Sequence, residues 1–305
     1  MRLTPGALWL RFRQKFGHGL RVAWYRDVVR PHILSTPPIT DTIDNRYEIH
    51  VLTSKQDWLN LVWTLKSFYI LSNRRYALCI HDDGSLTDAE FASLQMHFPD
   101  ARIIRRAVAD AKLAKVLRSY PRSLSVRNTN LPTAKVFDFA AFLESDRMAV
   151  FDSDLLFFAE PTVYLQRVED PDYRRNTFIT DIGPAYTVDP DKVSDLIGHQ
   201  LVSKLNSGLG LVHRRSICWD WTEEFLALPG ILTGRVWVVE QTLSALCSSR
   251  YGVELLPDEY TVSMEPGLGA RCFRHYVGAI RHLMYGEGIK RLVEDDFLRK
   301  LKSIA

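Results

Sequence analysis

The sequence predicts an α/β protein built on a mainly parallel sheet with helices on both faces. Short β-rich segments alternate with segments of helical periodicity between residues 47 and 104. This alternation favours parallel strands joined by right-handed crossovers. In addition, the apolar run 148–151 leads directly into Asp152-Ser153-Asp154. In an open α/β sheet, ligands bind at the carboxyl ends of strands, so these aspartates indicate a site at the edge of the sheet.

The first half of the chain supplies three strands and two helices. The predicted elements, in order, are a strand at 47–53, a helix through 59–70, a strand at 76–80, a helix after Thr87 and a strand at 101–104. Alternating apolar residues define the strands, and apolar residues three or four apart define the helices. Thr87 and Glu90 form a capping box, which marks the start of a helix.

The second half is less regular. Residues 119–130 are polar, contain Pro121 and predict an irregular segment. The elements expected after it are a helix through 132–142, strands at 148–151, 177–180 and 205–213, and helices at 191–205, 219–228, 238–247 and 291–304. The last helix is acidic at its start and basic at its end, as the helix dipole favours.

Length and composition are those of a globular protein with a substantial core. The chain has 305 residues, of which 46% are apolar and 25% are charged. A net charge of +3 is too small to indicate a nucleic-acid-binding protein. The cysteines have no paired spacing and lie among apolar residues, so reduced thiols in a cytoplasmic protein are expected rather than disulfides or a zinc site. The four are Cys79, Cys218, Cys247 and Cys272.

The N-terminal segment, residues 1–40, differs from the rest of the chain. Residues 1–30 carry seven Arg or Lys residues against one acid, interleaved with aromatic and aliphatic residues. Such a segment either packs its aromatics on the domain or lies on an anionic membrane surface, here the inner face. No apolar run is long enough to span a bilayer, and no signal peptide is recognisable. Pro37-Pro38 is the expected linker to a catalytic domain at 41–290, which the helix at 291–305 follows.

The pair Asp152 and Asp154 is the first candidate site. Two carboxylates beside a buried strand are costly unless a cation or hydrogen-bond donors compensate them. A divalent metal ion carrying a phosphate would do so. The simpler alternative is a solvated turn.

Three later stretches add candidates. His275 offers a third ligand suited to manganese or a similar ion, whereas Gly278 and Arg281 suit a phosphate. Asn206-Ser207-Gly208 and Glu240-Gln241-Thr242 place polar groups at the starts of a strand and of a helix. The structural alternatives are a satisfied histidine, a surface arginine, a turn and an ordinary helix start.

Taken together, these motifs resemble glycosyltransferase family 8, the glycogenin and lipopolysaccharide galactosyltransferase group, which has the GT-A nucleotide-sugar fold. The resemblance covers residues 47–281 and rests most on the spacing of His275, Gly278 and Arg281. It implies that Asp152, Asp154 and His275 hold Mn²⁺ (or Mg²⁺) against the diphosphate of a UDP-sugar donor.

The resemblance also implies roles for other residues. Lys135, Gly278 and Arg281 would contact the donor phosphates or sugar, and Ser153 belongs to the same donor-binding motif. Thr53 and Ser54 match the strand end where uridine binds. Asn206 and Glu240 match positions that hold the donor sugar, and Gln241 matches the glutamine near the anomeric carbon. The family has Asp-Gln-Asp where this chain has Glu240-Gln-Thr242, and lysine where it has Arg281.

The expected activity is transfer of a sugar, with retention of configuration, to a saccharide or lipid-linked acceptor. A sugar-phosphate nucleotidylyltransferase is the first alternative, but residues 53–57 lack the glycine-rich loop of that class. A non-catalytic nucleotide-sugar-binding protein is the second.

Overall fold

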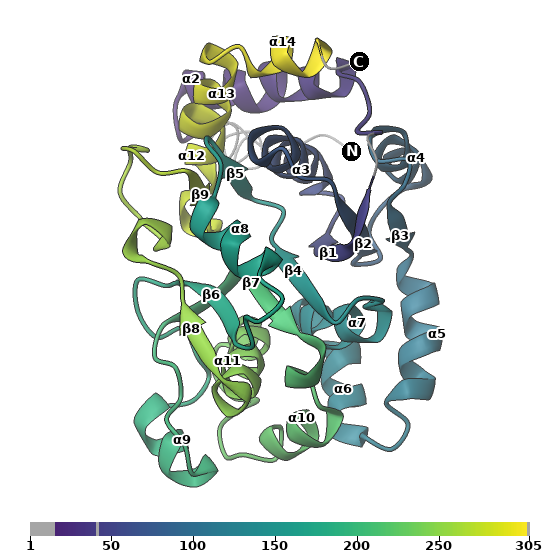
Figure 1. Cartoon of the computed structure of the whole chain (residues 1–305), viewed down its shortest axis with the longest axis vertical. Coiled ribbons are helices and arrows are strands. Elements are labelled where there is room, and N and C mark those ends of the chain that lie inside the picture. Colours follow the sequence, from purple (N-terminus) through teal and green to yellow (C-terminus); the bar gives the residue numbers. More distant parts are fainter. Residues whose placement is uncertain (1–15, 41–42, 304–305) are drawn as a thin grey trace, which may run out of the picture.

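A computed structural model describes residues 16–40 and 43–303, and shows a seven-stranded sheet flanked by helices (Figure 1). The strand order is β3-β2-β1-β4-β7-β6-β8, and β5 and β9 form a separate two-stranded sheet. The strands are β1 Asp44–Thr53, β2 Tyr76–Asp82, β3 Arg102–Ile104, β4 Arg147–Phe151, β5 Leu155–Phe157, β6 Asn176–Thr180, β7 Leu205–His213, β8 Val253–Leu255 and β9 Phe273–His275.

Parallel pairs predominate in the large sheet. The pairs β3–β2, β2–β1, β1–β4 and β6–β8 are parallel. Strand β7 is antiparallel to both of its neighbours, β4 and β6. The α/β class with a mainly parallel sheet is therefore confirmed. The antiparallel β4–β7 pair matters for function because it sets the start of β7 beside the end of β4.

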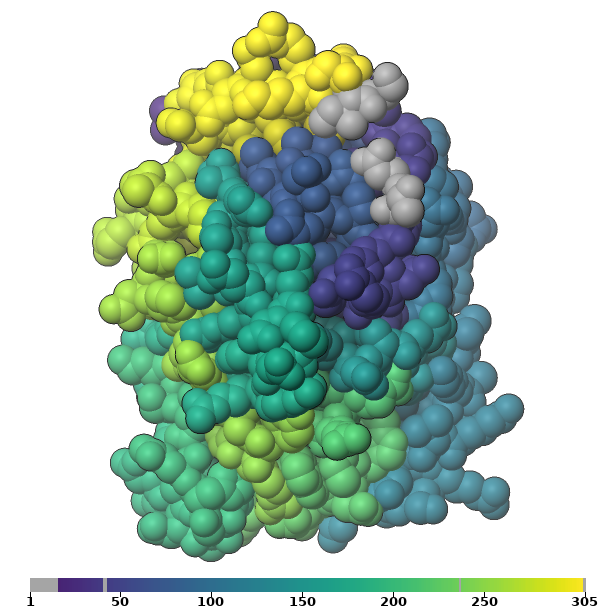
Figure 2. Space-filling view, in the orientation of Figure 1, coloured from purple at the N-terminus to yellow at the C-terminus, as the bar shows by residue number. Residues whose placement is uncertain are grey.

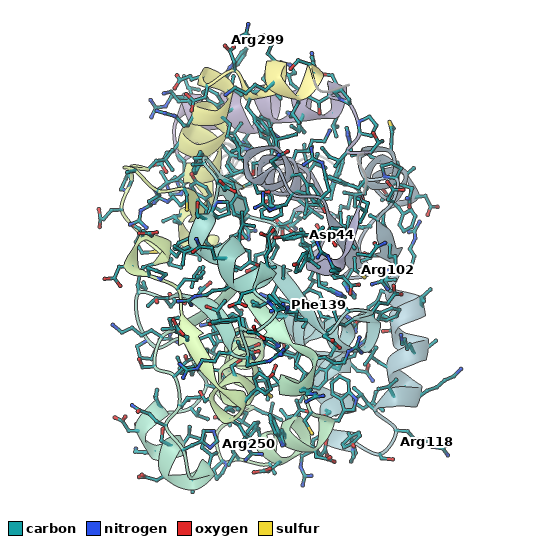
Figure 3. All side chains as sticks on the ribbon, in the orientation of Figure 1. Asp44, Arg102, Arg118, Phe139, Arg250 and Arg299 are labelled. Atoms are coloured by element: carbon teal, nitrogen blue, oxygen red, sulfur yellow. The ribbon has the colours of Figure 1, made fainter. Side chains whose placement is uncertain are left out.

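Helices bury both faces of the sheet. Alternate residues of the strands point to opposite faces, so each face has its own apolar cluster. On the first face lie α3 Trp58–Ser72, α4 Asp88–His97 and α8 Thr162–Glu169. On the second lie α5 Arg106–Val116, α6 Pro121–Thr129, α7 Ala134–Phe142, α9 Pro190–Ile197, α10 Trp219–Phe225 and α11 Val239–Tyr251. Phe139 is central in the molecule, whereas Arg118 and Arg299 lie at its periphery (Figure 3).

Both ends of the described chain pack at one end of the molecule, over α3. The C-terminal elements cover this end (yellow in Figure 2). The Trp63 indole donates to the carbonyl of Arg30 at 2.9 Å and its ring lies 6.0 Å from that of Phe297. The elements here are α2 Leu20–Trp24, π-helices Tyr25–Val29 and Met284–Ile289, the 3₁₀ turn Arg30–Ser35, α12 Arg281–Leu283, α13 Lys290–Glu294 and α14 Phe297–Lys302.

Most predicted elements are present, including the capping box of Thr87 and Glu90. The irregular segment predicted at 119–130 is wrong, because α6 forms there, and α5 was not predicted at all. Both helices are held by tertiary ion pairs that no local pattern reveals. The buried Arg127 pairs with Asp138 on α7 at 2.7 Å and with Asp110 on α5.

Two predicted helices are interrupted by a residue in the left-handed conformation. The helix predicted at 191–205 ends at Ile197, because Gly198 adopts a left-handed conformation with φ of 71°. Leu205 instead begins β7. The terminal helix predicted at 291–304 is broken at Asp296, which has φ of 59° and separates α13 from α14.

Candidate functional site

The end of β4 and the start of β7 lie side by side and bring the first two motifs together. Phe151 pairs with Leu209, and the backbone N–H of Asp152 donates to the carbonyl of Gly208 at 2.8 Å. Residues 206–208 therefore lie next to the Asp-Ser-Asp motif although more than fifty positions separate them in the sequence. Only the antiparallel pairing produces this contact, because in a parallel pair the two segments would lie at opposite ends of their strands.

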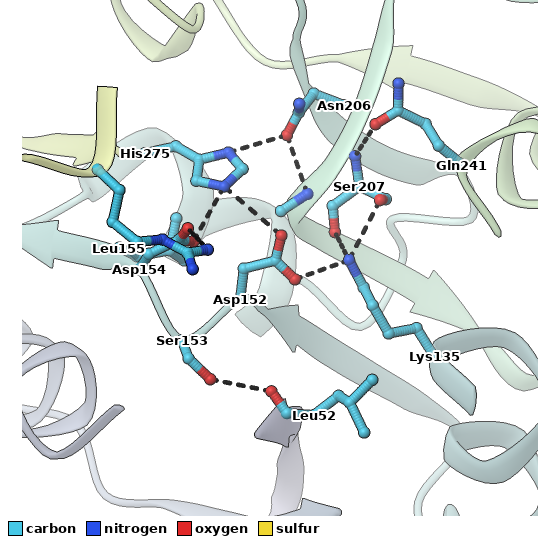
Figure 4. A network of polar contacts seen from close by, with 12 residues as sticks. Leu52, Lys135, Asp152, Ser153, Asp154, Leu155, Asn206, Ser207, Gln241 and His275 are labelled. Carbon is cyan, nitrogen blue, oxygen red and sulfur yellow. Dashed lines mark hydrogen bonds and ion pairs between the residues drawn. The ribbon is translucent and has the colours of Figure 1, made fainter. Parts of the chain in front are cut away.

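The small sheet brings His275 to the same place. Strand β5 pairs with β9 so that Leu155 faces His275, and the N–H of Tyr276 donates to the carbonyl of Asp154 at 2.9 Å. His275 Nε2 then lies 3.1 Å from Asp154 Oδ1 and 3.5 Å from Asp152 Oδ2 (Figure 4). Three groups that ligate divalent metals thus face one point.

Asn206 fixes the orientation of the histidine ring. Its Nδ2 donates to Asp181 at 2.9 Å, so its Oδ1 is the acceptor that faces His275 Nδ1 at 3.0 Å and the N–H of Gly208 at 3.0 Å. With Nδ1 donating, the neutral ring presents the lone pair of Nε2 to the aspartates, which is the tautomer a metal ligand needs.

Gly208 provides the space that the ring occupies. A Cβ at this position would lie 2.3 Å from His275 Cε1 and 2.5 Å from Nδ1. Any larger residue would displace the ring. The glycine in the middle of a buried strand is therefore explained by the histidine that packs on it.

Lys135, in the first turn of α7, is buried among carboxylates. Its Nζ donates to Asp152 Oδ1 at 2.7 Å and to the carbonyl of Ser207 at 3.0 Å, and Glu240 lies 3.6 Å away. Burial lowers the pKa of Lys135, but the charge of Asp152 and then that of Glu240 outweigh it, so the net change is upward. The lysine therefore stays charged.

Arg281 joins two carboxylates on the other side of the motif. Its two terminal nitrogens donate to Asp154 at 2.7 Å and to Asp57 at 3.1 Å. Burial raises the pKa of Asp154, but His275 and Arg281 oppose burial and together lower it. Burial also lowers the pKa of His275, whereas Asp154 and Asp152 raise it to above its usual value.

The start of α11 closes a cavity of about 310 Å³ in front of these groups. The Glu240 carboxylate accepts from the hydroxyls of Ser207 at 2.8 Å and Ser244 at 3.0 Å, and burial raises its pKa. Gln241 accepts from the N–H of Ser207 at 3.3 Å and donates to the carbonyl of Ala185 at 3.1 Å. Both residues line the cavity together with Lys135, Asp152, Asp154 and Arg281.

Four predicted residues remain, of which Ser153 also lines the cavity, whereas Thr53, Ser54 and Gly278 do not. The Ser153 hydroxyl donates to the carbonyl of Leu52 at 2.9 Å, which ties the motif to the end of β1. Ser54 hydrogen-bonds Asp57 at 3.1 Å, while the Thr53 hydroxyl is buried without a hydrogen-bond partner in the described chain. Gly278 is exposed, and no described atom lies within 4 Å of where its Cβ would be.

Three residues of this site were not predicted from the sequence. Asp57 holds Arg281, Asp181 holds Asn206, and Trp237 lines the cavity with 67% of its surface exposed. Asp57 is three residues after the Thr53-Ser54 strand end, and Asp181 directly follows β6, so a search for carboxylates at strand ends would have found both. Nothing in the sequence distinguishes Trp237 from a core tryptophan.

The donor set fits a divalent metal ion such as Mn²⁺. Two carboxylates and one imidazole are ligands that this ion accepts, and they converge with the correct histidine tautomer. The site holds two basic side chains, Lys135 and Arg281. It holds more carboxylates than that, namely Asp57, Asp152, Asp154, Asp181 and Glu240. An added cation would offset this excess of negative charge.

No family model and no curated protein matches the sequence, but many solved structures share its fold. The bifunctional glycosyltransferase WbbM matches with a TM-score of 0.51 and 10% identity, over 87% of this chain and 53% of that one. Mouse xyloside xylosyltransferase 1 matches with a TM-score of 0.48 and 11% identity, over 79% of this chain and 99% of that one. The galactosyltransferase LgtC, in complex with donor and acceptor sugar analogues, matches with a TM-score of 0.48 and 13% identity. The match covers 81% of this chain and 94% of that one.

At such low identity the likeness concerns the fold alone. Membership of glycosyltransferase family 8 stays a prediction. The chain has the GT-A glycosyltransferase fold.

Proposed function

We propose that the protein is a metal-dependent glycosyltransferase that moves a sugar from a nucleotide-sugar donor, a UDP-sugar, to a saccharide or lipid-linked acceptor with retention of configuration. The observation that carries the proposal is the convergence of Asp152, Asp154 and His275 in a GT-A fold, beside a cavity that both aspartates line. Thr53 and Ser54, at the end of β1, are the proposed contacts of the uridine. Gly278 leaves room for a phosphate beside Arg281.

The chemistry requires negative charge to be stabilised as it develops on the leaving diphosphate. A bound divalent ion would supply Lewis-acid stabilisation of these phosphate oxygens. Lys135 Nζ lies 2.7 Å from a carboxylate oxygen of Asp152, and a terminal nitrogen of Arg281 lies 2.7 Å from one of Asp154. Both side chains remain charged, so they can bind the donor phosphates together with the ion.

Asn206, Glu240 and Gln241 are proposed to hold the donor sugar. The amide of Gln241 cannot act as a carboxylate nucleophile, and the carboxylate of Glu240 is turned toward Ser207 and Ser244. Attack of the acceptor on the same face from which the diphosphate leaves is consistent with this arrangement. Gln241 would then orient the sugar.

An apolar recess of about 560 Å³ adjoins the cavity and shares Pro132 and Trp237 with it. The remainder of its lining consists of Ser125, Val126, Thr129, Asn130, Leu131, Leu232 and Val239. An exposed tryptophan offers a flat apolar face to an acceptor sugar, and the aliphatic residues suit a lipid-linked one. This recess supports the acceptor side of the proposal.

Peripheral membrane contact through residues 1–36 is the other part of the acceptor proposal. Leu20, Trp24 and Val28 recur every four residues and have 75%, 57% and 39% of their surface exposed. Arg21 lies within the same stretch, which is the composition of an interfacial segment. No described helix is long and apolar enough to cross a membrane. Deletion of residues 1–36 is expected to abolish binding to anionic vesicles, and unchanged binding would refute the contact.

A panel of UDP-, GDP- and CDP-sugars tests the activity, with Mn²⁺ or with a chelator. We expect slow release of UDP from one UDP-sugar without acceptor, and only with the metal ion. Binding without hydrolysis would favour the non-catalytic alternative. Formation of a nucleotide sugar from a nucleoside triphosphate and a sugar phosphate would favour the nucleotidylyltransferase alternative.

A further inference from the structure

Three other potential metal ligands lie together on the opposite side of β1 and β2 from α3. His50 of β1 pairs in register with Cys79 of β2, and His81 follows Cys79 by two residues on the same face of the strand. All three side chains are at most 1% exposed. The group belongs to the core of the sheet and takes no part in the proposed transfer reaction.

The three ligand atoms point at one another. His50 Nδ1 is 3.0 Å from His81 Nε2, Cys79 Sγ is 3.3 Å from the same nitrogen, and all three atoms lie within 4.8 Å. A zinc ion with bonds of about 2.0–2.1 Å to nitrogen and about 2.3 Å to sulfur holds neighbouring ligands roughly 3.3–3.8 Å apart. Shifts of a few tenths of an ångström would therefore open the group around an ion.

A fixed carboxylate stands behind one of the histidines. Glu48 Oε1 lies 3.2 Å from His50 Nε2, and the other carboxylate oxygen accepts from the N–H groups of Glu144 at 2.9 Å and Ser145 at 3.2 Å. Arg102 also binds Glu48. A carboxylate behind a metal-bound imidazole fixes its tautomer and increases its basicity. Glu48 faces the ring nitrogen of His50 that is turned away from His81.

The surroundings keep the group uncharged. The ring of Phe139 lies 5.3 Å from that of His50 and 4.7 Å from that of His81. Burial lowers the pKa of His50 to about 3 and that of His81 well below its usual value, so both rings are neutral. Burial raises the pKa of the Cys79 thiol. A histidine–histidine hydrogen bond within the core is the ordinary explanation, but it uses only two of the three facing groups.

We propose that His50, Cys79 and His81 form a closed second metal site for a thiophilic ion, Zn²⁺ or Cu⁺. On binding, the Cys79 thiol loses its proton to solvent and a sulfur–metal bond forms, while both imidazoles donate through nitrogen lone pairs. No oxidation or reduction is involved. The ion would join β1 to β2, the strands whose ends carry Thr53 and Asp82, and would set their register. This proposal is independent of the proposed sugar transfer.

The test starts with the unmodified full chain, refolded anaerobically with reductant and either Zn²⁺ or Cu⁺ and then freed of loose metal with a chelator. Refolding is used because the closed site offers no entry path. We expect one ion per chain, and X-ray absorption showing one sulfur and two imidazole nitrogens around it. The ion that stays bound to the protein after treatment with the chelator is the one that the site prefers.

Variants separate this site from the aspartate site. Asp154→Asn should keep the ion, whereas the nearly isosteric Cys79→Ser should lose it and show a lower Tm only in the metal-loaded state. The proposal is overturned by retention of the ion in Cys79→Ser, by its loss in Asp154→Asn, or by the absence of a sulfur neighbour in the spectrum. The X-ray absorption spectrum of the unmodified protein shows whether sulfur binds the ion, so it tests the proposal even if Cys79→Ser does not fold.

Discussion

The candidate site and the core of the protein both bury titratable side chains, but the pKa values of these side chains shift in opposite directions. Lys135 and Lys66 are each at most 8% exposed. Carboxylates surround Lys135, so its pKa rises although burial lowers it. The partners of Lys66 are the neutral oxygens of Thr36 and Pro37, and burial lowers its pKa to about 7.

The histidines show the same contrast. Asp154 and Asp152 raise the pKa of His275 against the effect of burial, whereas burial is the largest influence on the pKa of His50 and lowers it. Burial by itself therefore drives a group toward its neutral form. The region at the end of β4 differs because it retains several charges in a small volume, as expected where a metal ion and phosphates bind.

The largest effect is expected from Asp154→Asn. The change removes a charged ligand and leaves Arg281 without its 2.7 Å partner. We expect Mn²⁺-dependent UDP binding to disappear and turnover to fall by about 10³-fold, because the metal ion supplies several kcal/mol to the transition state. Calorimetry with UDP and an assay of UDP release measure this. Asp172→Asn, at a carboxylate that is 92% exposed, is the matched control. Unchanged UDP affinity in Asp154→Asn would refute the metal assignment.

Gly208→Ala should reduce metal binding without changing any ligand. The new Cβ would lie 2.3 Å from the His275 ring and force it away from the aspartates. A loss of Mn²⁺ affinity of about 10–100-fold is expected, as for other changes that misorient a ligand. Electron paramagnetic resonance of free Mn²⁺ measures the affinity. Gly183→Ala is the control, since no described atom lies within 4 Å of its Cβ. Equal affinities in the two variants would show that His275 does not bind the ion.

Arg281→Lys tests whether charge or the forked geometry matters. Lysine keeps the positive charge but cannot bridge Asp154 and Asp57 with two nitrogens of a planar group. We expect roughly 10-fold lower kcat/KM for the donor, and a larger loss for Arg281→Ala, from steady-state rates. Identical rates for the lysine and alanine variants would argue against a phosphate contact.

The smallest effect concerns the core. Because the folded pKa of Lys66 is about 7 and the unfolded value is 10.5, the unfolded state binds more protons between these values. The free energy of unfolding should therefore rise with pH above 7, by about 1–2 kcal/mol up to pH 9. Urea unfolding at both pH values measures this. Lys66→Met should have a smaller slope, and an equal slope would show that Lys66 is charged when buried.

Local sequence patterns determined much of the fold. Apolar runs predicted β4 and β7 to within one residue of their observed bounds, and the capping box placed α4 correctly. Those patterns reflect burial within a single element. They failed at α5 and α6, where the buried Arg127 joins three helices, because an ion pair between distant segments leaves no periodic signal.

The sequence by itself placed Asp152 and Asp154 at a strand end and singled out His275 and Arg281 as candidates of the right chemistry. Their arrangement was decided by tertiary structure. The antiparallel β4–β7 pair sets Gly208 against Asp152, and the β5–β9 pair carries His275 to Asp154. Strand direction and pairing depend on which elements bury which faces across the whole chain, so Asp57, Asp181 and Trp237 became part of the site only in the folded protein.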